Sequence, residues 1–105
     1  MDLDVLLPLT SFSQLTFFDF QGCGLTGTLS PLWGELDKLT YLDLSRNNIT
    51  GSLPTWRNLR SLELMTLSNN KISGSLPASW GEGLFMSMKQ LSLQKNLIDG
   101  DIPGQ

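Results

Sequence analysis

Apolar and polar residues alternate in short segments that recur about every two dozen residues along the chain. The clearest segment, residues 39–54, reads LTYLDLSRNNITGSLP, and the same frame fits residues 15–30, 62–77 and 88–103. Apolar residues at every second position give a short strand one apolar face. One such strand cannot bury that face alone, whereas stacked copies form a continuous core. The pattern therefore predicts a solenoid with one strand per coil.

A single position after each predicted strand carries a residue suited to bonding the backbone of the turn. It is occupied by Cys23, Asn47, Asn70 and Asn96. Stacked asparagine amides form a ladder that satisfies otherwise buried polar groups. Cysteine is a small apolar substitute with a weak donor, so we interpret Cys23 as structural too.

Three tryptophans, Trp33, Trp56 and Trp80, follow the predicted strands, and we expect them to fill the convex side of the core. The copies differ in length only near these residues, with two additional residues between 81 and 88. These differences lie on the connecting side of the coil, where a solenoid tolerates them.

The repeat resembles the leucine-rich repeat, and its Gly-x-Leu-Pro tail resembles the subtype called plant-specific. The resemblance implies an α/β solenoid that is mostly β, coiled right-handedly, with a parallel concave sheet and short 3₁₀ or irregular convex segments. A narrower likeness rests on Leu76-Pro77-Ala78-Ser79-Trp80, which is similar to leucine-rich surface antigens of trypanosomatid parasites such as Leishmania. That likeness implies display on a cell surface and binding to host receptors.

The repeats define a domain over residues 15–105, with residues 1–14 as a partial N-terminal repeat or cap. Because no polar capping segment follows the fourth copy, we expect a fragment of a longer protein. The alternative is a short natural protein whose exposed repeat ends associate weakly with another copy.

Composition and charge exclude several classes of function. Ten acidic against seven basic residues leave no basic stripe, so nucleic acid is an unexpected partner. No apolar stretch approaches the ~20 residues needed to span a bilayer. The chain has no histidine and one cysteine, and it lacks a glycine-rich phosphate loop. We therefore expect neither an enzyme nor a cofactor or metal site.

Variable positions around each strand form columns on the concave face, because neighbouring strands lie about 4.8 Å apart. Apolar anchors beside a polar rim are typical of a protein-binding patch. Two adjacent carboxylates in these columns, Asp19 and Asp43, suit a ligand's lysine or arginine better than they suit catalysis on an open face. The partner-binding candidates are Phe17, Asp19, Tyr41, Asp43, Arg46, Leu64, Thr66, Asn69, Gln90 and Lys95.

Three functions remain open: a protein-recognition module on a cell-surface or secreted parent protein, an intracellular scaffold in the cytoplasm, and a structural spacer with end-to-end assembly. The sequon Asn48-Ile49-Thr50 favours secretion, where Asn48 would carry a glycan in an exposed turn. The single cysteine favours the cytoplasm. We favour recognition of a macromolecular partner through the concave face.

Overall fold

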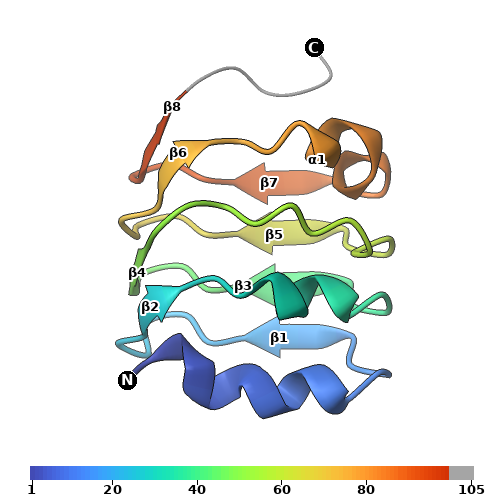
Figure 1. Cartoon of the computed structure of the whole chain (residues 1–105), viewed down its shortest axis with the longest axis horizontal. Coiled ribbons are helices and arrows are strands. Elements are labelled where there is room, and N and C mark those ends of the chain that lie inside the picture. Colours follow the sequence, from blue (N-terminus) through green and yellow to red (C-terminus); the bar gives the residue numbers. More distant parts are fainter. Residues whose placement is uncertain (100–105) are drawn as a thin grey trace.

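The computed structural model describes residues 1–99, which form a stack of coils (Figure 1). Each coil contributes one strand to a four-stranded parallel sheet, in the order β1 (Phe17–Asp19), β3 (Tyr41–Asp43), β5 (Leu64–Thr66) and β7 (Gln90–Ser92). The register aligns equivalent positions of successive copies. The solenoid and its parallel sheet, as predicted from the repeats, are confirmed. The Gly-x-Ile-Pro tail of the fourth copy, residues 100–103, lies outside the described residues.

A second strand follows each turn and lies along one side of the stack (Figure 1). These strands are β2 (Thr26–Thr28), β4 (Asn48–Thr50), β6 (Ser73–Ser75) and β8 (Leu97–Asp99). They pair as β2–β4 and β6–β8, and a bridge between Ser52 and Ser73 joins the two pairs. The glycines of the first three tails, Gly27, Gly51 and Gly74, are held at positive φ, with 81° at Gly51. A side chain at Gly51 would also collide with Thr28, whose Cγ2 lies 2.7 Å from the Cβ position.

Short helical segments connect the coils on the remaining side. They are the 3₁₀ segments η1 (Leu3–Ser11), η2 (Pro31–Glu35) and η3 (Leu84–Met86), with one α-helical turn, α1 (Ser79–Glu82). Ser30 begins η2, because its hydroxyl accepts a hydrogen bond from the Leu32 amide at 3.1 Å. The two additional residues of the fourth coil fall where α1 and η3 lie, outside the sheet.

The N-terminal segment packs on the first coil. Leu3 of η1 is buried in the core. The amide of Thr26 donates to the Met1 carbonyl at 2.8 Å, and Asp2 forms a bridge with Thr26. Residues at the start of the chain therefore extend the second-strand side of the stack beyond β2.

The core contains all three tryptophans, as expected from the sequence. The indole N–H of Trp56 donates to the Ser30 carbonyl and that of Trp80 to the Pro54 carbonyl, both at 2.9 Å. Each of these bonds ties one coil to the coil before it. The indole nitrogen of Trp33 is buried and has no hydrogen-bond partner within residues 1–99.

Asparagine side chains form the interior ladder in the second, third and fourth coils. Asn47 donates to the carbonyls of Leu44 in its own turn, at 2.9 Å, and Phe20 in the preceding coil, at 3.0 Å. Its Oδ1 accepts from the amides of Cys23 and Leu25, both at 3.0 Å. Asn70 and Asn96 also bond both their own turn and the coil before it.

Cys23 requires a correction to its interpretation as a ladder residue. Its thiol is exposed, and its one described bond, to the Gln21 carbonyl at 3.5 Å, stays within its own turn. Among the described residues, no coil of the same kind precedes the first turn. A side chain at position 23 therefore has no backbone groups of a preceding coil to bond.

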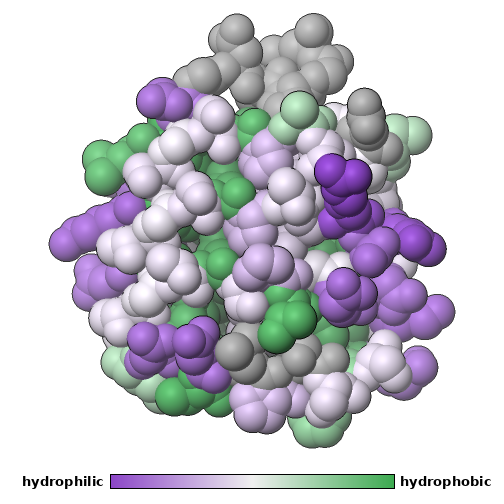
Figure 2. All heavy atoms as spheres, in the orientation of Figure 1, coloured by the Kyte–Doolittle hydropathy of each residue, from purple (hydrophilic) through white to green (hydrophobic). Residues whose placement is uncertain are grey.

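The surface seen in Figure 2 has hydrophilic side chains along both lateral edges and separate hydrophobic patches between them. Within residues 1–99, no helix has the length and apolar character required to cross a bilayer.

Candidate functional site

The sheet presents a row of outward side chains, which we call the sheet face. Its two columns are Phe17, Tyr41, Leu64 and Gln90, and Asp19, Asp43, Thr66 and Ser92. The register makes each residue the direct neighbour of its equivalent in the next coil. The structure therefore brings the predicted candidates of these two columns together.

An aromatic pair marks one corner of the sheet face. The rings of Phe17 and Tyr41 stack with centroids 4.3 Å apart and planes 9° from parallel. Phe17 is 58% exposed, and Tyr41 is half-buried beside Leu64. An exposed aromatic stack that continues into an aliphatic residue offers apolar anchorage with little side-chain freedom to lose.

The carboxylates of Asp19 and Asp43 are register partners but have different environments. Asp19 is exposed, whereas Asp43 is only 5% exposed. The two aspartates were expected to share an open face, and the burial of Asp43 departs from that expectation. Asp43 lies on an inner strand between Asp19 and Thr66, and its Oδ1 accepts bonds from the Ser45 amide at 3.0 Å and the Ser45 hydroxyl at 2.7 Å.

Polar residues two positions after each carboxylate belong to the site but were not among the predicted site residues. The backbone N–H of Gln21 donates to the Asp19 carboxylate at 3.2 Å, as the backbone N–H of Ser45 does to Asp43. In the third coil, the hydroxyls of Thr66 and Ser68 lie 3.3 Å apart. Because side chains two apart on a strand share a face, the alternation of the sequence already contained this signal.

The next column, Arg46, Asn69 and Lys95, lies in the turn after the strands rather than on them, and all three side chains are exposed. Their φ angles are 57°, 59° and 60°, and Gly22 takes the equivalent position with φ of 64°. The turn therefore imposes a left-handed backbone on this column. Arg46 reaches back to the first coil, where its Nη2 donates to Oε1 of Gln21 at 2.6 Å.

Local charge also alters the ionisation of Tyr41. Partial burial, followed by the negative charges of Asp43 and Asp19 and a hydrogen bond to the Asp43 side chain, raises the pKa of the Tyr41 hydroxyl above its ordinary value. The same field favours a positive group at this corner of the sheet face.

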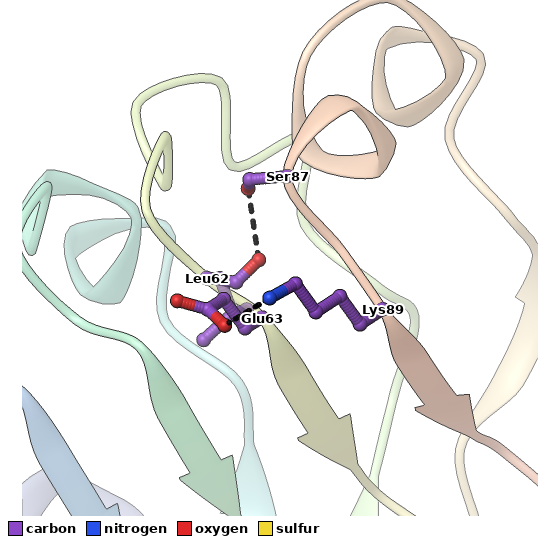
Figure 3. Close-up of polar contacts among 4 residues, drawn as sticks. All are labelled: Leu62, Glu63, Ser87 and Lys89. Carbon is purple, nitrogen blue, oxygen red and sulfur yellow. Dashed lines mark hydrogen bonds and ion pairs between the residues drawn. The ribbon is translucent and has the colours of Figure 1, made fainter.

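The opposite end of the sheet carries a matched pair of charges. Lys89 Nζ lies 3.1 Å from Glu63 Oε1, at the entrances to β7 and β5, and Ser87 donates to the Leu62 carbonyl at 2.8 Å (Figure 3). Both charged side chains are largely exposed, so the pair adds at most about 1 kcal/mol to stability. The charges of Glu63 and Lys89 nevertheless neutralise each other.

Asn48 is exposed, as expected, but begins strand β4 rather than lying in a turn. Its amide N–H donates to the Leu25 carbonyl at 2.8 Å, so the backbone is fixed while the side chain faces outward. The sequon is therefore accessible on the second-strand side, away from the sheet face.

Comparison with known proteins gives one family. The model described as Leucine Rich Repeat matches residues 14–36, 38–59 and 58–82. The LRR receptor-like serine/threonine-protein kinase GSO2 of Arabidopsis thaliana is 39% identical over 92 residues, which are 88% of this chain and 5% of that protein.

Solved structures give the same picture. The ectodomain of the Arabidopsis thaliana receptor kinase GASSHO1/SCHENGEN3, in complex with CASPARIAN STRIP INTEGRITY FACTOR 2, matches 92% of this chain with a TM-score of 0.85 and 31% identity. The Arabidopsis receptor kinase HAESA, in complex with the peptide hormone IDA and the co-receptor SERK1, matches 90% with a TM-score of 0.79 and 25% identity. The chain spans 12% and 16% of these two proteins.

Proposed function

The chain belongs to the leucine-rich repeat family, and from this membership we propose that it is a non-catalytic recognition module that binds an extended peptide on its sheet face. The observation that carries the proposal is the exposed Phe17–Tyr41 stack. Its rings lie beside Asp19, Asp43 and the Arg46–Gln21 pair, so apolar anchors adjoin a polar rim.

The relatives refine the proposed partner. GASSHO1/SCHENGEN3 and HAESA are receptor kinases, and HAESA is bound to a peptide hormone and a co-receptor. We propose the same class of partner for this chain: a secreted peptide, with or without a co-receptor protein. The parent protein would then present these repeats outside the cell, where the exposed Asn48 can carry a glycan. A glycopeptide containing Asn48 from native material would support this location over an intracellular scaffold.

The parasite-surface interpretation gains no support from these relatives, because GSO2, GASSHO1/SCHENGEN3 and HAESA are receptor kinases of a plant. The frame of the repeat is common to both groups, and the Leu-Pro-x-x-Trp phrase that suggested the parasite antigens places Trp80 in the core. A buried tryptophan reports on packing rather than on a partner.

The proposal is tested by peptide capture from a plant extracellular extract. The wild-type chain and a Tyr41→Ala/Arg46→Ala variant would be immobilised, and the retained peptides identified by mass spectrometry. Leu32→Ala/Arg57→Ala is a matched control, because it also removes one large surface side chain and one arginine but lies on the helical side. Circular dichroism would establish that all three fold.

Peptides retained by wild type and the control but lost from the sheet-face variant support the proposal. Peptides retained equally by all three chains would place binding elsewhere on the molecule and contradict it.

A further inference from the structure

Two carboxylates meet at the β1–β3 corner of the sheet face, and neither forms an ion pair within the described residues. Asp19 and Asp43 are direct register partners. Within residues 1–99, the ion pair that forms joins Lys89 to Glu63 at the other end of the sheet. Arg46 donates to the neutral side chain of Gln21 instead of to either carboxylate. This corner therefore differs from the β5–β7 end, where Glu63 and Lys89 form an ion pair.

Burial increases the need for a countercharge at Asp43. The residue is 5% exposed, and its carboxylate accepts hydrogen bonds from neutral donors, the Ser45 amide and hydroxyl and the Tyr41 hydroxyl. Such donors ease the loss of hydration but leave the negative charge in place. A cation brought by a ligand would be attracted by both carboxylates, and pairing with the buried Asp43 would cost little further desolvation of that carboxylate.

An aromatic surface lies on the same side of the strand. Phe17 precedes Asp19 by two residues, so its ring and the carboxylate face the same way about 7 Å apart along the strand. Tyr41 stacks on Phe17 at 4.3 Å, and more than half of Phe17 remains exposed. A cation within about 6 Å of such a ring is attracted by its π electrons.

We propose that the corner formed by Phe17, Asp19, Tyr41 and Asp43 receives an arginine side chain of the bound peptide. This inference rests on the proposed function and names the ligand chemistry of the same face. A guanidinium group fits better than an ammonium group, because its plane stacks on an aromatic ring while its edge donates two parallel bonds to a carboxylate.

The difference in charge between the β1 and β7 ends of the sheet face also sets the orientation of a bound peptide. At the opposite end Lys95 is exposed, and β7 offers the neutral side chains of Gln90 and Ser92. A peptide running across the four strands would therefore place its arginine over β1 and β3 and its neutral or acidic residues over β7.

The test uses a phage-displayed library of random linear peptides selected on the whole chain. Selected peptides would be synthesised with arginine and with citrulline, a neutral side chain of nearly the same shape. Binding of each pair would be titrated against wild type, Asp19→Asn, Tyr41→Ala and Asp37→Asn. Asp37 is an exposed aspartate on the helical side, so Asp37→Asn makes the same change of charge away from the sheet face.

We expect the selected peptides to share an arginine, and citrulline to weaken binding to wild type about tenfold, as for a lost charge-assisted bond. The penalty should shrink to about twofold in Asp19→Asn, persist in Asp37→Asn and decrease at high salt. Peptides that depend on Tyr41 but show the same citrulline penalty in Asp19→Asn as in wild type would overturn the arginine site and leave peptide recognition intact. Peptides that bind without regard to Tyr41 would overturn both.

Discussion

The side chain of Asn70 donates to the carbonyl of Leu44, one coil earlier in the stack, at 3.0 Å. The same amide donates to Leu67 in its own turn at 3.0 Å, and its Oδ1 accepts from the Ile49 amide at 3.1 Å. One buried side chain thus satisfies backbone groups of two coils. The coils are therefore held together by polar groups as well as by the apolar core.

Asn70→Ala should lower the free energy of unfolding by about 1–3 kcal/mol, because it leaves buried backbone groups without partners. Chemical denaturation monitored by circular dichroism would measure the loss. The neighbouring Asn69→Gly is the control: Asn69 is exposed and has left-handed φ, so glycine fits its backbone. Equal losses from both variants would contradict the role of the ladder.

Cys23 should react with a thiol reagent in the folded protein, because its side chain is exposed. We expect one thiol per chain to be titrated without denaturant, as the sequence has a single cysteine. Cys23→Asn should change stability by less than about 1 kcal/mol, since the one bond of the thiol within the described residues is weak and lies within its own turn. If Cys23 reacted with the reagent only after the chain unfolds, its side chain would be buried in the folded protein, contrary to the structure.

The repeat alone was enough to predict the fold, because a frame repeated four times constrains every strand and its register. Phe17, Tyr41 and Leu64 are neighbours for that reason. Two features could not be predicted from the sequence. The burial of Asp43 depends on strands on both sides and on Ser45, and the exposure of Cys23 depends on the absence of an equivalent coil before the first turn among residues 1–99. The burial of both residues depends on their neighbours in adjacent coils, and the identity of the residue alone does not indicate it.

Gly22→Ala should destabilise the protein by about 1–2 kcal/mol, because alanine disfavours the left-handed backbone found there. Apart from Gly22 and its two chain neighbours, no atom of the described residues lies within 4 Å of the position of the added Cβ, so collision does not contribute to the loss. Gly22→Asn should cost less than half as much, since asparagine tolerates this conformation and occurs at the equivalent Asn69. Thermal denaturation of the two variants would measure the difference, and equal losses would exclude backbone strain as the cause.

Trp33→Phe should cost about 1–2 kcal/mol less than Trp56→Phe. Both substitutions remove a similar volume from the core, but the Trp56 indole donates to Ser30, whereas the buried Trp33 indole nitrogen lacks an acceptor in the described part of the chain. Losing Trp56 also leaves the Ser30 carbonyl without this bond. Urea denaturation of both variants would test the prediction, and an equal cost would show that Trp33 finds an acceptor in solution.

Tyr41 should ionise at a pH above the ordinary tyrosine pKa of 10.0. It is the only tyrosine of the chain, so absorbance at the tyrosinate band reports on it alone. Because the pKa is raised in the folded state, the neutral hydroxyl contributes stability that is complete below the unfolded pKa. That contribution is lost as the pH rises through the folded pKa.

Asp19→Asn should move the titration of Tyr41 toward lower pH, because it removes one of the two charges that oppose ionisation. Asp37→Asn should leave the curve unchanged, since that carboxylate is not among the groups that raise the Tyr41 pKa. If Asp19→Asn left the curve in place too, the field of the carboxylates would not reach the tyrosine hydroxyl. The corner of the sheet face would then lose one of the observations that favour a cation there.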